Sequence, residues 1–240
     1  MQIVNDPYFK LIELASTPLP QSVVYAGLHQ CYYHDMVALE EKDISENRCG
    51  EIIVDKLLKG DFHGSPLEHA SITFNFGYFP HSLISQLTRH RHISFSIQSF
   101  RYTGEYLNTV TIENVERYFY LRPVGFYTDR HGAKYEYSET HRAADIEFLM
   151  YAVHHYNISI KLGMPTEQAR GLIPFDIRQH GIMTMNIRAV MQLLDHRYKA
   201  NAQVEIQTLA QMVFLHFQEW VPEIAGWYEK SRLGRAKLAP

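Results

Sequence analysis

The chain has 240 residues, of which 46% are hydrophobic, enough to build a substantial core in one sizeable domain. The formal net charge of -3 argues against a protein whose whole surface binds nucleic acid, so any anion site must be local. Cys31 and Cys49 are too few for a disulfide framework, and no stretch approaches the ~20 apolar residues that span a bilayer. We therefore expect a cytoplasmic protein with no membrane partner.

Hydrophobic spacing predicts alternating strands and helices in the first part of the chain. Ser45 and Glu46 are typical of a helix start, and Gly60 of a helix stop. Ile72, Phe74 and Phe76 alternate with smaller or polar residues, which indicates a strand with one buried face. The expected elements are a strand over 10–14, helices over 20–36 and 45–60, a strand over 70–79 and a helix over 80–91.

The second part of the chain is predicted to be mostly helical. An extended piece follows residue 91 and continues to Arg101, and a hairpin turns near His131 and Gly132. The remaining expected elements are a long helix over 138–162, a short helix over 164–174, a strand over 177–187 and helices over 187–198 and 202–220. There is no internal repeat or low-complexity linker. We therefore expect a single α+β domain over residues 1–240, with a central, mostly antiparallel sheet flanked by long helices.

Residues 89–101, "RHRHISFSIQSFR", combine arginines and serines and contain no acid. Arginine forks pair bidentately with phosphate, and serine hydroxyls can complete such a cradle. A solvated basic turn is the alternative interpretation, but Phe95, Ile97 and Phe100 should bury the segment. The pattern therefore predicts a local phosphate site.

Two other kinds of site fit this segment less well. A metal could be bound by the imidazoles of four histidines, His63, His69, His90 and His92. Their spacing matches no familiar zinc signature and the neighbouring arginines would repel a cation, so we expect no metal. Interleaved arginines and aromatic residues also resemble a stacking platform for single-stranded nucleic acid, but the net charge counts against a nucleic-acid partner. A nucleotide- or RNA-binding protein without catalysis stays open as the second hypothesis.

The same segment resembles the signature of flavin-dependent thymidylate synthases, in which Arg-His-Arg is followed by seven residues and a serine, and then by Arg-Tyr. The matching residues are Arg89, His90, Arg91, Ser94, Ser99, Arg101 and Tyr102. "HGSPLEH" over 63–69 resembles the family segment that contacts flavin, and Gln86 falls where the family has a glutamine. "EQARGLIP" places Arg170 in the family's arginine-bearing turn. A C-terminal block is similar too and supplies Asn186, Arg197, Gln203 and Glu205, so the resemblance covers about residues 10–220.

The resemblance implies reductive methylation of dUMP to dTMP, with carbon from methylenetetrahydrofolate and hydride from NADPH through FAD. It also implies a homotetramer whose active sites are built from several subunits. The implied dUMP-binding residues are Gln86, Arg89, Gln98, Ser99, Arg101, Arg170 and Arg197. The implied FAD-binding residues are His63, Ser65, Glu68, Arg89, His90, Arg91, Asn186 and Asn201. We expect Arg197 to be catalytic, because positive charge beside the uracil oxygens can make carbon 5 electron-rich without a cysteine nucleophile.

Some residues depart from the family pattern or have a second interpretation. His29 and Ile97 stand where other members have an arginine and an acid, so no ligand contact is carried onto them, and Asn201 stands where some members have a histidine. Glu68 could instead pair with an arginine, and Asn186 could cap the helix that follows it.

Overall fold

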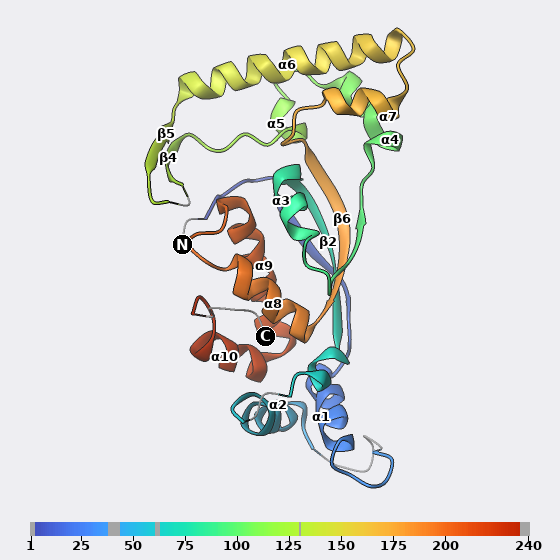
Figure 1. Ribbon diagram of the computed structural model, residues 1–240, viewed down its shortest axis with the longest axis vertical. Coiled ribbons are helices and arrows are strands. Elements are labelled where there is room, and N and C mark those ends of the chain that lie inside the picture. Colours follow the sequence, from blue (N-terminus) through green and yellow to red (C-terminus); the bar gives the residue numbers. More distant parts are fainter. Residues whose placement is uncertain (1–2, 38–43, 61–62, 130, 236–240) are drawn as a thin grey trace.

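A four-stranded antiparallel sheet forms the centre of the computed structural model, which describes residues 3–37, 44–60, 63–129 and 131–235 (Figure 1). In spatial order the strands are β1 (Lys10–Ser16), β2 (Ser71–Pro80), β6 (Arg178–Asn186) and β3 (Ser94–Ile97). Each neighbouring pair is antiparallel. The expected mixed helix and antiparallel-sheet domain is therefore confirmed.

The two faces of this sheet have different surroundings. On β2, Ile72, Phe74 and Phe76 point to the inner face and are at most 1% exposed, as their alternation predicts. On the outer face Ile12 pairs with Asn75, which in turn pairs with Ile182, and the two isoleucines are 56% and 41% exposed. The outer face thus keeps apolar side chains exposed within the single chain.

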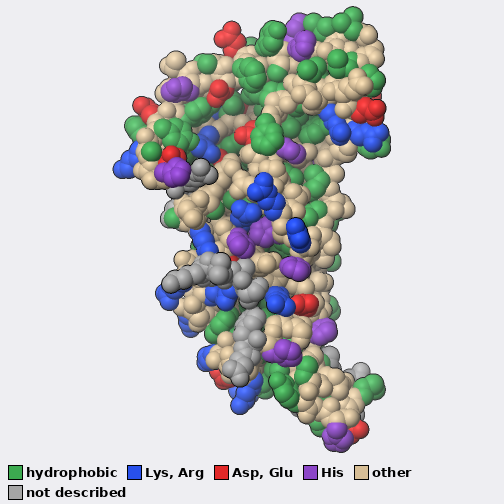
Figure 2. Space-filling model, viewed as in Figure 1, with side chains coloured by type: hydrophobic (Ala, Val, Ile, Leu, Met, Phe, Trp, Pro, Cys, Tyr) green, Lys and Arg blue, Asp and Glu red, His purple; other side chains and the backbone are tan. Residues whose placement is uncertain are grey.

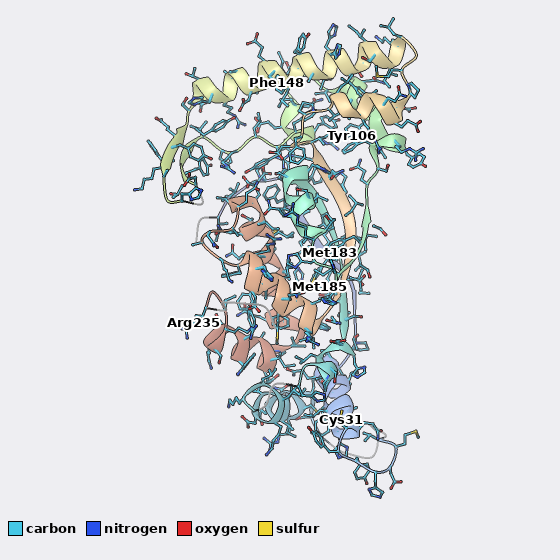
Figure 3. All side chains as sticks on the ribbon, viewed as in Figure 1. Cys31, Tyr106, Phe148, Met183, Met185 and Arg235 are labelled. Carbon is cyan, nitrogen blue, oxygen red and sulfur yellow. The ribbon has the colours of Figure 1, made fainter. Side chains whose placement is uncertain are left out.

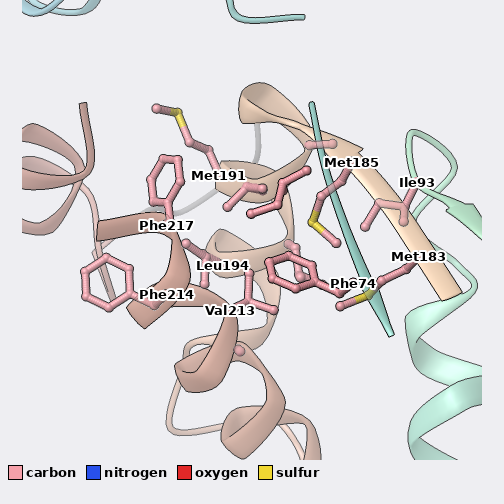
Figure 4. Close-up of a cluster of buried hydrophobic side chains, with 14 of the residues drawn as sticks. Phe74, Ile93, Met183, Met185, Met191, Leu194, Val213, Phe214 and Phe217 are labelled. Atoms are coloured by element: carbon pink, nitrogen blue, oxygen red, sulfur yellow. The ribbon is translucent and has the colours of Figure 1, made fainter. Parts of the chain in front are cut away.

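Two C-terminal helices, α8 (Ile187–Arg197) and α9 (Val204–Trp220), pack on the inner face, and α10 (Pro222–Ser231) packs against α9. Figure 4 shows Phe74, Met183 and Met185 from the strands among apolar side chains of α8 and α9. The two methionines lie near the middle of the molecule in Figure 3. The main core therefore joins the C-terminal helices to strands β2 and β6.

A second apolar cluster lies under the long helix α6 (Glu139–Lys161), which crosses the upper end of the molecule in Figure 1. Ser138 caps α6 by accepting the His141 N–H, and Leu162 follows its last residue, as predicted. Tyr106 packs against this cluster, whereas Phe148 on α6 is 61% exposed (Figure 3). The predicted hairpin is also confirmed, with strands β4 (Gly125–Thr128) and β5 (Lys134–Tyr137) and a left-handed Gly132 in its turn.

Several predicted boundaries are wrong. The helix expected over 20–36 is α1 (Pro20–Gln30), because the residues that follow have no buried apolar face to hold a helix. The helix expected over 80–91 is α3 (His81–Leu87), which ends at its last buried leucine. The extended piece ends at Ile97, because Ser99 begins a helical turn, α4 (Phe100–Thr103).

The remaining elements are short. The helix predicted from Ser45 is α2 (Glu46–Ile53), which continues as a π-helical turn over Val54–Leu58. Helix α5 (Val115–Tyr118) and helix α10 were not expected, whereas α7 (Thr166–Ala169) falls inside the predicted 164–174 segment. None of the helices within the described ranges is both long enough and apolar enough to cross a membrane.

Candidate functional site

The arginine-rich turn, residues 88–93, joins α3 to β3. Some of its side chains point to solvent and others into the protein. The His90 N–H donates to the Leu87 carbonyl, and the Ile93 N–H donates to the His90 carbonyl. Within this tight turn Arg89 and Arg91 are exposed, whereas His90 is only 6% exposed. The turn therefore presents its arginines to a ligand and buries its histidine.

A hollow of 310 Å³ lies between this turn and α8, and we call it the arginine hollow. Its lining residues are Arg89, His90, Arg91, His92, Gln192, His196 and Arg197. Figure 2 shows Lys, Arg and His side chains gathered midway along this face of the molecule. No carboxylate is among the lining residues in the described part of the chain, so the hollow suits a phosphorylated ligand.

Arg197, the last residue of α8, is held at this hollow by two acceptors. Its Nε–H donates to His90 Nε2 at 3.0 Å, and its Nη2 donates to the Gln86 carbonyl at 3.0 Å. Burial and the neighbouring Arg197 and His196 lower the pKa of His90 to about 4, so the imidazole is neutral and can accept. Two of the five guanidinium N–H donors are used, which leaves three with no protein partner among the described residues.

A smaller hollow of 110 Å³ adjoins the arginine hollow and shares His92 and Gln192 with it. We call it the Glu68 hollow, and its other lining residues are Glu68, Asn186, Arg188 and Ala189. Glu68 forms an ion pair with Arg188 at 2.6 Å, and the Asn186 side chain accepts the Ala189 N–H at 2.8 Å, capping α8. Both second interpretations of these residues therefore hold in the structure. His63 and Ser65 precede Glu68 in the chain, and His63 Nε2 lies 3.1 Å from Ser65 Oγ.

A third hollow, of 580 Å³, contains Gln98, Ser99 and Arg170, and we call it the Ser99 hollow. Glu167 brings two arginines to it, because its carboxylate pairs with Arg101 at 3.0 Å and its carbonyl accepts the Arg170 Nε–H at 3.2 Å. The Gln98 side chain donates to Thr103, while its Oε1 is buried without a partner among the described residues. Ser99 and Arg170 thus offer a hydroxyl and a guanidinium group at this hollow, and Glu167 pairs with Arg101, which is not among the lining residues.

The fourth hollow, of 850 Å³, is lined by Gln86, and we call it the Gln86 hollow. Gln86 Nε2 donates to Gln203 Oε1 at 2.5 Å and to the Ser82 carbonyl at 3.1 Å. Asn201 also lines this hollow, and it is not among the residues that line the arginine hollow. Among the expected flavin residues, Asn201 is the one that lines this hollow.

The expected dUMP residues fall into two groups within one chain. Arg89 and Arg197 line the arginine hollow, with the Gln86 carbonyl bonded to Arg197. Gln98, Ser99 and Arg170 line the Ser99 hollow, which shares no described lining residue with the arginine hollow. The resemblance therefore named residues that a single subunit does not bring together.

Three residues of α8 were missed by the sequence reasoning. Arg188, Gln192 and His196 line the Glu68 and arginine hollows at intervals of four residues. Residues four apart lie on one face of a helix, so the position of Arg197 in the same helix was a usable signal.

Metal ligands and cysteine thiols are two further kinds of group whose positions bear on the chemistry of the four hollows. No three His, Cys, Asp or Glu side chains in the described ranges lie close enough to hold a metal ion. Cys31 is exposed and Cys49 is buried, and neither is among the residues that line the four hollows.

The chain matches one protein family over most of its length and is similar to curated members of one enzyme class. Residues 11–223 match the family described as "Thymidylate synthase complementing protein". The chain is 30% identical over 221 residues to a flavin-dependent thymidylate synthase of Haloarcula marismortui, covering 88% of this chain and 87% of the relative. It is 28% identical over 246 residues to the Halobacterium salinarum enzyme of the same name, covering 95% and 98%.

Two solved structures share the fold. Thymidylate Synthase X from Helicobacter pylori, determined with FAD and dUMP, has a TM-score of 0.68 at 20% identity and covers 90% of this chain and 99% of that one. A UMP/dUMP methylase from Streptomyces cacaoi, bound with 5-Br UMP, has a TM-score of 0.73 at 21% identity and covers 100% of both chains.

Proposed function

Because this chain belongs to the thymidylate synthase complementing protein family, whose relatives named above are flavin-dependent thymidylate synthases, we propose that it reductively methylates dUMP to dTMP with FAD as cofactor. It is accordingly an FAD-dependent thymidylate synthase. The observation that carries the proposal is Arg197, held by His90 and Gln86 with three N–H donors left for a ligand, at a hollow without a carboxylate.

The donors at the arginine hollow and the Glu68 hollow fit a flavin dinucleotide. Arg89 and Arg91 are exposed cations beside the hollow, and arginine is well suited to a diphosphate. We propose that these arginines and the turn around His90 bind FAD, together with His63, Ser65, Glu68 and Asn186. When bound, FAD supplies hydride transfer, with NADPH proposed as the reductant and methylenetetrahydrofolate as the carbon donor. Asn201 lines the Gln86 hollow, and its contact with FAD stays a proposal.

The Ser99 hollow is proposed to hold the phosphate of dUMP through Ser99, Arg101 and Arg170. The ion pair between Arg101 and Glu167 is about half exposed, with side chains 48% and 54% accessible, so little free energy opposes its exchange for phosphate. Gln98 lines the same hollow and is kept as a proposed dUMP contact.

Arg197 is proposed to act on the uracil ring. Carbon 5 must become electron-rich before it attacks the methylene carbon, and negative charge then develops on the ring oxygens. Guanidinium N–H groups fixed beside those oxygens stabilise this charge most in the transition state. Gln86 and Arg89, which lie beside Arg197, are proposed to hold the nucleotide in that orientation.

Assembly as a homotetramer is proposed to join the two groups of dUMP residues, with the Ser99 hollow of one subunit facing the arginine hollow of another. The chain has apolar surface for such contacts, since Ile12 and Leu14 on β1 are 56% and 52% exposed, and Phe148 and Leu162 at α6 are 61% and 83% exposed. Complementation tests this arrangement. At a dUMP concentration well below its Kd, Arg170→Met should be much less active than wild type and Arg197→Ala should be inactive, and oligomers that mix the two variants should regain activity. Mixed oligomers that are no more active than the separate variants would contradict a shared site.

The first test of the function is the visible absorption spectrum of the purified protein, followed by its change on adding dUMP. We expect a flavin band that shifts with dUMP, because the two ligands share one site. If no band appears even after FAD is added, the arginines serve another phosphate, and the nucleotide- or RNA-binding hypothesis takes its place.

A further inference from the structure

We propose that His90 is a positioning residue, which acts on the substrate through Arg197. Its neutral imidazole accepts the Nε–H of Arg197 and thereby sets the direction in which the other guanidinium donors point. The inference rests on the function proposed above, because it assigns to His90 the orientation of the group that polarises uracil. It also gives His90 a role that differs from direct flavin contact.

The imidazole is held as rigidly as a positioning acceptor requires. His90 is 6% exposed, and its backbone is fixed on both sides by hydrogen bonds of 3.1 Å to Leu87 and 3.2 Å from Ile93. The ring packs edge-on against His196, with ring centroids 5.8 Å apart and an interplanar angle of 67°. A buried ring held by its backbone and by a neighbouring ring keeps one orientation.

Hydrogen bonding determines the protonation state of the ring. Because Arg197 can only donate, the Nε2 that faces it must carry no proton, and the single proton of the neutral ring must be on Nδ1. The charged or titratable groups that face the ring are Arg197 and His196 of α8, and Arg89 lies in the same turn beside the hollow. If His90 were an imidazolium, its Nε2–H would face the Nε–H of Arg197, and its positive charge would lie beside those of Arg197 and Arg89.

Two hydrogen-bond acceptors fix the orientation of the Arg197 guanidinium plane, whereas one acceptor would not. The Gln86 carbonyl holds one Nη2 proton of Arg197, and His90 holds the Nε–H at a different edge of the same plane. With only the carbonyl bond, the plane could rotate about that contact. Charge that is not held in place stabilises the transition state less, because orienting it during the reaction then costs free energy.

The test compares two substitutions of nearly the same size. Glutamine can place its Oε1 near the position of His90 Nε2, whereas leucine fills the space with no acceptor. We expect His90→Leu to lower kcat about ten- to hundredfold, as loss of a hydrogen bond to a charged group does, while the KM for dUMP and the flavin content stay close to wild type. His90→Gln should recover most of the lost kcat.

A double-mutant cycle separates positioning from flavin contact. The cycle uses Arg197→Lys, which keeps the positive charge but has no Nε–H for His90 to accept. If His90 acts through Arg197, His90→Leu has no further effect on the rate of the Arg197→Lys variant. Loss of flavin in His90→Leu, or losses in rate that multiply in the double variant, would overturn the proposal. So would a His90→Leu enzyme with wild-type kcat.

The hydrogen bond can also be examined without turnover. In holoprotein labelled with ¹⁵N-histidine, the signals lost in His90→Gln identify His90, and at about pH 7 they should be those of a neutral ring with its proton on Nδ1. An Nε2–H tautomer or an imidazolium at that pH would overturn the proposal even if His90→Leu does not fold. Absence of dTMP formation by the wild-type protein would instead refute the proposed function and leave this reading of the contact intact.

Discussion

Replacing Arg170 by methionine tests the proposed phosphate site at one of its exposed cations. Arg170 uses one of its five N–H donors on the Glu167 carbonyl, which leaves four without a partner among the described residues. Methionine keeps much of the apolar stem and removes the charge and the donors. A hydrogen bond to a charged group contributes about 1.5–3 kcal/mol, and since Arg170 is exposed we take the lower end. The expected result is a rise of about tenfold in the Kd for dUMP.

The assay is a titration of the purified flavoprotein with dUMP, followed by calorimetry or by the flavin absorption band. Arg48→Met is the matched control, because it removes the same charge from α2, where the exposed pair between Arg48 and Glu51 contributes little. Flavin content should be unchanged in both variants. A Kd for Arg170→Met that equals the Kd for Arg48→Met would refute a phosphate contact by Arg170.

Three further outcomes are expected. Arg197→Ala should abolish dTMP formation and leave flavin bound; loss of flavin and fold together would contradict its catalytic role. As the pH falls from about 7 to 5, His90 should lower the free energy of unfolding by about 2 kcal/mol. The folded ring, with a pKa of about 4, stays neutral over this range, whereas the unfolded ring, with a pKa of 6.5, takes up a proton. His90→Gln should remove this part of the loss of stability at low pH, measured by urea titration. Asn186→Ala should cost about 1 kcal/mol of stability by removing the cap of α8, and Asn186→Asp, which can still cap, should restore it.

The parts of the fold with a strong local pattern could be predicted from the sequence. The alternation in β2 and the start of α6 near Ser138 each depend on residues close together in the chain, and both are present as expected. The end of α1 could not be predicted, because it depends on where the tertiary core stops. The short helical turn after Ser99 likewise replaces an extended segment that the alternation favoured.

The arginine hollow was predictable in part, for a similar reason. The resemblance indicated Arg89, His90, Arg91 and Arg197 as site residues, and the turn and α8 bring all four to one hollow. The contact between His90 and Arg197 joins residues 107 positions apart, so no local pattern could indicate it. The separation of the Ser99 hollow also depends on tertiary structure, because β3 pairs with β6 from Ser94 to Ile97 and Ser99 follows the far end of that strand.

The most direct test of the central claim is an anaerobic reaction that contains the purified protein, FAD, NADPH, dUMP and methylenetetrahydrofolate labelled with ¹³C at the methylene carbon. The account predicts dTMP with the label in its methyl group, formed only when every component is present and absent with Arg197→Ala. A wild-type protein that binds FAD and dUMP but forms no labelled dTMP would contradict it.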